Sequence, residues 1–368
     1  GTCVNISMKL LATSLGVLAI TLSSLAKAQD AISDFFGFHY ELIQPNTFTP
    51  IAVNVTQNRE GIHSRSINDT FGTNNEVGLK TEAGLNKSDV IWVKDGSDWL
   101  QIYYNNVENE VFGITKGWKA IGLGNQDMGV YFIPLNSGLF IQSRKDFEWY
   151  IAWTGYIKQQ PMYHEVTKGF NVLNSGYPTQ ISLNDSKINL SEGFKKGDAL
   201  SGDIIWIYRG LENNLPVYER YYYSEGDFFF TEGWKKVGNG DTDAGEDTIL
   251  NTLIIETRGD GGTVVVYPPV GFPHYNNTRP LAPTKPEVYT LMTLDEFGDP
   301  FFNVLWEARA REIDYTTQIW DEFSKEWWNL NTLWGEKGEV LSNWAGILGL
   351  QRGIGRVKAT WQTQNRQD

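Results

Sequence analysis

Apolar and polar positions alternate in short blocks along most of the chain. Stretches rich in Ile, Val, Trp, Tyr and Phe are separated by Gly, Asn and Asp at intervals of roughly 8 to 12 residues. This pattern predicts short strands in β-sandwiches or barrels, so we expect an all-β protein. Residues 203–208 are apolar after their first position, which predicts a strand in the centre of a sheet.

One order of segments occurs twice. An apolar strand, a tyrosine-containing strand, a Gly-Trp-Lys turn with a glycine-rich loop and a closing strand follow one another in residues 202–258 and in residues 89–144. We predict two tandem homologous modules, residues 29–160 and 161–268. Each is expected to end in a β-hairpin, with residues 148–153 and 263–267 as last strands. The first copy has extra length around residues 57–76, which predicts a long mobile surface loop.

The C-terminal part begins with a cluster of prolines. Prolines fix the backbone and remove ladder donors, so residues 269–286 are expected to form a semi-rigid linker. Aromatic and β-branched segments then predict strands at residues 287–291, 301–306, 314–320, 327–330 and 356–361. Their order and spacing resemble a fibronectin type III module over residues 287–361, followed by a polar tail at 362–368.

The N-terminal stretch has the form of a secretory signal. Met8 and Lys9 precede an apolar run of about 16 residues that ends in Ala26-Lys27-Ala28, the small-residue form that signal peptidase cleaves. We expect a signal peptide at residues 8–28 after an upstream translated segment at 1–7, and a mature protein that is secreted or held at the cell surface. A membrane anchor is the alternative, but a span needs roughly 20 residues.

The mature chain would contain no cysteine, because the single one is Cys3. Without disulfides, stability must come from its apolar and aromatic core, and this composition suits a bacterial exported protein. The chain has 14 Trp, 17 Tyr and 19 Phe and a formal net charge of −13. A nucleic-acid partner is excluded on this charge, since phosphate binding needs a basic surface. No membrane span is expected after the signal.

The duplicated segments also resemble a known group of proteins. The resemblance is carried by Gly202-Asp203, the tyrosines at 221–223, Gly233-Trp234 and the glycine-rich loop 238–245. It is to the repeated units of uncharacterised exported proteins of Verrucomicrobia and related bacteria, and in the first copy Ser88 replaces the glycine before Asp89. That family has no assigned activity, so the resemblance implies a fold without a function.

An acidic loop in the second copy is the candidate metal site. Asp241, Asp243 and Asp247 lie on a glycine-bent loop, and Ca²⁺ takes six to eight such oxygen ligands. Calcium is therefore the one candidate cofactor. The first copy keeps only Asn125 and Asp127 at the matching places. The alternative is a solvated acidic turn whose glycines permit positive φ.

The sequence contains no recognisable catalytic constellation. The histidines His39, His63, His164 and His274 are far apart and form no metal-ligand pair, and no G-x-S-x-G elbow occurs. Glu148 and Glu219 are in strand-like segments, but paired carboxylates of a glycosidase cannot be identified from spacing. We therefore predict no catalytic residue and no enzyme activity.

The surplus of aromatic residues points to a binding surface. Alternate rings of a tyrosine strand lie on opposite faces, so we expect Tyr222, Trp234 and Trp328 to contact a ligand such as a glycan. The alternative is that these rings are covered by a second sheet. The first hypothesis for function is a non-enzymatic structural or interaction protein of the bacterial cell exterior, which self-associates or binds another surface protein. The second is a binder of extracellular polysaccharide, with or without calcium, and the third is a glycan hydrolase.

Overall fold

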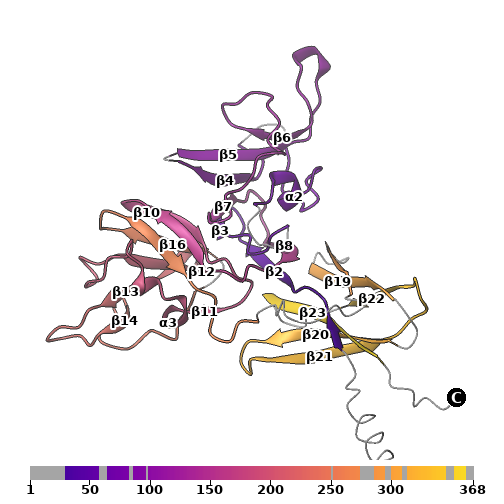
Figure 1. Ribbon diagram of the computed structural model, residues 1–368. Helices are drawn as coiled ribbons and strands as arrows, with labels where there is room; N and C mark the ends of the chain where they lie inside the picture. The colour runs from indigo at the N-terminus through magenta and orange to yellow at the C-terminus, as the bar shows by residue number, and fades with distance from the viewer. Residues whose placement is uncertain are drawn as a thin grey trace, which may run out of the picture.

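The computed structural model describes residues 30–57, 64–82, 86–96, 98–249, 252–273, 286–294, 300–308, 313–344 and 352–361. Strands account for 49% of the chain and helices for 5%, which confirms the all-β class. The strands gather into three lobes around a common centre (Figure 1). The predicted signal peptide, the polar tail and most of the predicted linker lie outside the described residues.

The first lobe contains an antiparallel five-stranded sheet of order β3-β7-β4-β5-β6. Its strands are β3 (Phe48–Ile51), β7 (Leu139–Gln142), β4 (Val90–Asp95), β5 (Asp98–Asn105) and β6 (Gly117–Ala120). A short 3-10 helix, η1 (Glu110–Phe112), lies in the loop between β5 and β6. The apolar central strand β4 supplies Ile91 and Val93 to the core, and both are fully buried.

The second lobe contains a five-stranded sheet of order β10-β16-β12-β13-β14. Its strands are β10 (Gly169–Asn174), β16 (Thr252–Thr257), β12 (Ile204–Glu212), β13 (Leu215–Ser224) and β14 (Gly233–Lys236). Strand β12 is central, as predicted for residues 203–208. The neighbouring small elements are β11 (Ile181–Ser182), which pairs with β15 (Thr248–Ile249), and the helices α3 (Leu183–Ser186) and η2 (Ile188–Leu190).

A second layer covers each of these sheets. Strand β8 (Trp149–Tyr156) pairs with β2 (Phe36–Ile43) in the first lobe, and β17 (Gly262–Val266) pairs with β9 (Met162–Val166) in the second. The predicted closing hairpins are therefore wrong. The chain leaves β16 at Arg258 and Gly259, whose N–H groups donate to the buried carboxylate of Asp203, and crosses to the opposite layer.

The segment predicted as a long mobile loop is partly folded into the core. Within it, α2 (Ile67–Phe71) begins at Ser66, whose hydroxyl accepts a hydrogen bond from Asp69 N while the Asp69 carboxylate accepts from Ser66 N. Ile67 and Phe71 are fully buried in the first core. The prediction of a free surface loop is therefore wrong for the described part, residues 64–76, because apolar side chains of this segment are buried.

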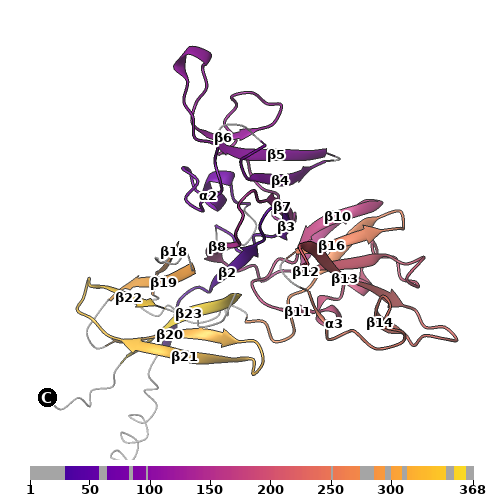
Figure 2. The same cartoon turned by 180° about the vertical axis from the view of Figure 1, so that it is seen from behind.

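The third lobe combines strands from both ends of the chain. One sheet has the order β18-β19-β22, and a six-stranded sheet has the path β21-β20-β23-β2-β8 with β1 beside β23. The strands not yet bounded are β1 (Asp30–Ile32), β18 (Val288–Leu294), β19 (Pro300–Glu307), β20 (Ile313–Asp321), β21 (Glu326–Leu333), β22 (Val340–Trp344) and β23 (Arg352–Trp361). Strand β22 was not predicted. The sheet expected from residues 287–361 thus also contains strands from residues 30–43 and 149–156, which Figure 2 shows from behind.

Close contacts join the three lobes at their centre. A Cβ atom on Gly37 would lie 2.8 to 2.9 Å from Ile157, Pro178 and Val55, so this strand packs without room for a side chain. The Asn54 amide donates to the carbonyl of Tyr177 at 2.9 Å, and the Asn174 amide donates to that of Val53 at 2.9 Å. Among the described residues no helix is long and apolar enough to cross a membrane.

Candidate functional site

Two of the three predicted ligand-contacting rings are buried. Trp234 is 0% exposed and lies in the second core, with its ring centre 5.4 Å from that of Tyr223. Tyr222 points to the opposite face of the sheet but is only 4% exposed. The prediction that these two residues present their rings to a ligand is therefore wrong. Trp328 on β21 is 59% exposed and keeps a free face.

The side chain that explains the burial of Tyr222 is a lysine. Lys235, paired with Tyr222 across the strands, is 1% exposed, and its ammonium donates to Thr231 Oγ1 at 2.7 Å and to the carbonyl of Asp241 at 3.1 Å. Residues 231–241 are therefore tied down over this face. Lys119 in the first lobe is also buried and donates to Thr115 Oγ1 and the carbonyl of Asn125.

The three predicted calcium ligands have other partners, and that of Asp247 is the side chain of Tyr221. Asp241 forms an ion pair with Lys235 at 2.8 Å and accepts from Thr231 N, and Asp243 accepts from Gly245 N at 3.1 Å. Within the described ranges, no three His, Cys, Asp or Glu side chains are grouped to hold a metal. Calcium binding stays a prediction. Its test is a calcium-dependent rise in thermal midpoint that disappears in an Asp241→Ala, Asp243→Ala variant.

The outer face of the second sheet carries a different set of aromatic residues. Phe170 on β10 is 60% exposed and contacts the ring of Trp206 on β12 edge-on at 5.9 Å. Tyr218 on β13 contacts the other side of Trp206 at 6.1 Å and lies 5.4 Å from Tyr208. Burial raises the pKa of Tyr208 to about 12. We call Phe170, Trp206, Tyr218 and Tyr208 the second-lobe strip.

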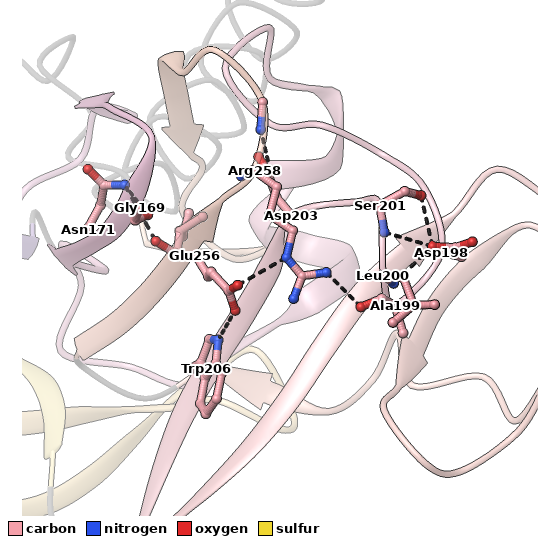
Figure 3. A network of polar contacts seen from close by, with 12 residues as sticks. Gly169, Asn171, Asp198, Ala199, Leu200, Ser201, Asp203, Trp206, Glu256 and Arg258 are labelled. Carbon is pink, nitrogen blue, oxygen red and sulfur yellow. Dashed lines mark hydrogen bonds and ion pairs between the residues drawn. The ribbon is translucent and has the colours of Figure 1, made fainter.

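A polar network fixes Trp206 in this strip (Figure 3). Its indole Nε1 donates to Glu256 Oε2 at 3.1 Å, and Glu256 Oε1 accepts from Arg258 Nε at 3.0 Å. Arg258 Nη1 in turn donates to the carbonyl of Ala199 at 2.7 Å. The indole ring is therefore held in one orientation before any ligand arrives, which reduces the entropy lost on binding.

Covered surface lies on either side of the strip. Towards the first lobe, Gly138 packs so closely that a Cβ atom there would lie 2.8 Å from Val172 and 2.9 Å from Thr252. At the other end, the loop around Ala199 is bound to Arg258. Between these contacts Phe170 is exposed and Trp206 and Tyr218 are half-buried, while the hydroxyl of Tyr208 is buried beside Thr49 of the first lobe.

The first sheet has an aromatic strip in the corresponding place. Phe48 on β3 is 41% exposed and contacts Trp92 on β4 at 5.6 Å, and Trp92 Nε1 donates to Gln142 Oε1 at 3.2 Å. Phe140 and Trp99, 5.6 Å apart, continue the row. These four aromatic residues form the first-lobe strip, and Trp92 and Trp206 both lie on central strands with their indole N–H bound to the neighbouring closing strand.

The groups considered for catalysis are not arranged as an acid and a base. Partial burial alone would raise the pKa of Glu219, but hydrogen bonds from Lys236, Arg209 and Tyr221 lower it to about 2, so this carboxylate stays ionised and ion-paired. Burial lowers the pKa of His39 to about 3 and that of His164 to about 4. Both histidines are fully buried, and each donates a ring N–H to a backbone carbonyl, His39 to that of Ala52 and His164 to that of Asn136.

No family model, curated protein or solved structure matches the chain. The strips themselves were missed in the sequence, although the signal was present. Trp92 lies between the core residues Ile91 and Val93, and Trp206 lies between Ile205 and Ile207. Because alternate side chains of a strand point to opposite faces, both indoles face away from the core. Continuity of the apolar run concealed that alternation.

Proposed function

We propose that this is an exported, non-catalytic glycan-binding protein made of two copies of one β module and a C-terminal β-sandwich. The observation that carries the proposal is the pair of partly exposed aromatic strips, each with an indole held by a polar partner. Flat rings on a rigid sheet suit the C–H faces of sugar rings, and exposed aromatic patches on soluble proteins commonly mark binding sites.

Equivalent contacts support the proposal that the two lobes are copies. The buried carboxylates of Asp89 and Asp203 each accept from the N–H of a lysine and of an arginine, Lys80 and Arg144 in one lobe and Lys195 and Arg258 in the other. The buried lysines at positions 119 and 235 bind their loops in the same way. Two strips on one rigid body would bind a long polysaccharide with a gain from multivalency.

The decisive experiment measures binding to a panel of soluble polysaccharides by affinity electrophoresis and calorimetry. Trp92→Ala and Trp206→Ala should each weaken binding at least tenfold, about 1.4 kcal/mol, and the double variant should abolish it. Phe228→Ser, at a loop tip outside both strips and 94% exposed in the parent, is the matched control. Undiminished binding by the double variant would refute the assignment.

A second candidate function is structural self-association, and one observation favours it. Strand β21 is an edge of the six-stranded sheet, and Trp328 and Leu330 on it are 59% and 47% exposed. A long apolar edge is a template for strand pairing. Sedimentation velocity should then show oligomers that Leu330→Lys and Trp328→Ser dissociate, whereas a monomer over the micromolar range would remove this candidate.

Export is proposed from the sequence at residues 8–28, which lie outside the described residues. Expression with the native N-terminus in a bacterial host should give a protein outside the cytoplasm whose first residue is Gln29. N-terminal sequencing of that material checks the cleavage site, and recovery of the uncleaved chain in the cytoplasm would contradict the assignment.

A further inference from the structure

One cation beside the second-lobe strip, Arg220, has no carboxylate partner in the part of the chain that the structure describes. Arg220 on β13 lies opposite Trp206 in the strand register, and its guanidinium carbon is 5.3 Å from the centre of the Trp206 ring. The side chain is exposed. Among the residues that the structure describes, no Asp or Glu forms an ion pair with it, so its charge is available to a ligand on the same ring.

The other charges next to Trp206 neutralise one another. Each Glu256 oxygen is already bound, one by the Trp206 indole and one by Arg258, and Arg258 carries the compensating charge. The free charge at this end of the strip is therefore that of Arg220. Because the whole chain has a net charge of −13, a positive site of this kind is a local feature and not a consequence of composition.

The first-lobe strip has uncharged residues at both corresponding places. Gln101 lies opposite Trp92 where Arg220 lies opposite Trp206, and Gln142 accepts from the Trp92 indole where Glu256 accepts from Trp206. The two strips thus share a central indole and differ in the charge of the residue opposite it, while the first strip has Lys94 over the ring of Trp99 at 5.3 Å, where the second has Tyr208 beside Tyr218. This difference supplies an internal comparison within one molecule.

We propose that the second-lobe strip binds an acidic polysaccharide, with a uronate ring stacked on Trp206 and its carboxylate paired with Arg220. A planar guanidinium matches a carboxylate with two parallel hydrogen bonds, and stacking on an indole leaves its donors directed outwards. The first-lobe strip has Gln101 and Gln142 beside its central indole, so it lacks an arginine at the matching place, and its lysine, Lys94, lies over the other indole, Trp99. This inference rests on the proposed function and names the class of sugar for one of its two sites.

The test uses two polymers that differ only in charge. Polygalacturonate and its fully methyl-esterified form have the same backbone, so the ester removes the carboxylate and keeps the sugar faces. Calorimetric titration of the mature chain should give an affinity at least tenfold higher for the acid form. Salt dependence alone is a poor readout, because screening weakens the ion pair but also weakens repulsion by the net negative charge.

Exchange variants complete the design. Arg220→Gln, which introduces the residue found opposite Trp92, should remove the preference for the acid and leave binding of the ester within about twofold. Gln101→Arg should create a preference at the first lobe in a Trp206→Ala background. Thermal midpoints within about 1 °C of the parent establish that these exposed substitutions leave the fold intact.

Three results would overturn the inference. They are equal affinity for the two polymers, a preference that persists in Arg220→Gln, and the absence of binding to either polymer. The proposed function fails separately. If uncharged glucans bind and Trp92→Ala with Trp206→Ala abolishes that binding, the protein is a glycan binder whose second strip does not select uronates.

Discussion

In each of the first two lobes, one buried aspartate accepts hydrogen bonds from backbone N–H groups at the point where the chain leaves the sheet. Asp203 is 0% exposed and accepts from the N–H groups of Lys195 at 2.9 Å, Arg258 at 2.6 Å and Gly259 at 3.3 Å. Asp89 does the same for Lys80 and Arg144, and burial raises its pKa. Each carboxylate therefore fixes the point where the chain passes from one layer to the other.

Removing this acceptor should destabilise the second lobe. In Asp203→Ala the three backbone N–H groups lose their partner, and each unsatisfied buried donor costs about 1–3 kcal/mol. We expect the free energy of unfolding in urea to fall by at least about 2 kcal/mol. Asp260→Ala, an exposed carboxylate in the adjoining turn, is the control and should change it by less than about 0.5 kcal/mol. Equal losses in the two variants would contradict the role of Asp203.

The buried histidines predict a loss of stability in acid. The folded-state pKa of His164 is lowered by burial to about 4 from an unfolded value of 6.5. Between these values the unfolded chain binds more protons, so stability falls as pH decreases from about 6.5 to about 4, by about 3 kcal/mol at most. His39, with a pKa near 3, acts in the same direction.

Glu41 opposes this effect, since burial raises its pKa to about 7 and protonation then favours the folded state. The contribution of His164 is separated from that of Glu41 by comparing the pH dependence of stability in the parent and in a His164 variant. The loss of stability between pH 6.5 and pH 4 should be smaller in His164→Gln than in the parent. Parallel curves of unfolding free energy against pH would show that His164 does not contribute.

The loops between β5 and β6 and between β13 and β14 are held at their base and open at their tip. At the base, the buried Lys235 binds Thr231 and Asp241. Lys235→Met should release this loop, raise amide exchange across residues 225–241 and expose Tyr222. Asp241→Asn should cost less than about 1 kcal/mol, because Asn125 already accepts from Thr115 in the first lobe. Unchanged exchange in Lys235→Met would contradict this account.

At the loop tips, apolar side chains contribute little to folding. Phe228 and Phe229 are 94% and 77% exposed, and Val111 and Phe112 are 88% and 76% exposed. Burial is what makes such side chains stabilising, so Phe228→Ser with Phe229→Ser should leave the thermal midpoint within about 1 °C. A fall of several degrees by calorimetry would mean that the tip packs against the rest of the chain.

At the scale of the whole molecule, shared strands couple the lobes. Strand β2 places Phe36 and Phe38 in the third core and Ile43 in the first, and Ile354 from β23 lies in the second. We expect one calorimetric transition for a protein of residues 29–368, with equal calorimetric and van't Hoff enthalpies. A chain ended at residue 285 would expose Phe36 and Phe38 and should aggregate. Separate transitions for the lobes, or a soluble truncated chain, would contradict this coupling.

Much of the local structure could be predicted from the sequence, because it depends on near neighbours. The apolar run 203–208 forms the central strand β12, and five segments after residue 286 form strands near the predicted positions. The expected hairpins are wrong because a strand after a turn can pair either within its own sheet or in the opposite layer. Here β17 pairs with β9 and β8 pairs with β2, both in the opposite layer, after the chain has passed the buried Asp203 or Asp89.

The binding surface depended on the tertiary structure. Period-two alternation of the sequence tells which side chains share a face of a strand, so Trp206 lies on the face opposite to that of the core residues Ile205 and Ile207. It could not determine which outer face stays open. Tyr222 is buried beside the loop that Lys235 anchors, whereas Trp206 lies between two covered regions and stays half-buried. The sequence thus determined an all-β chain rich in aromatic rings, and only long-range packing decided which of those rings can meet a ligand.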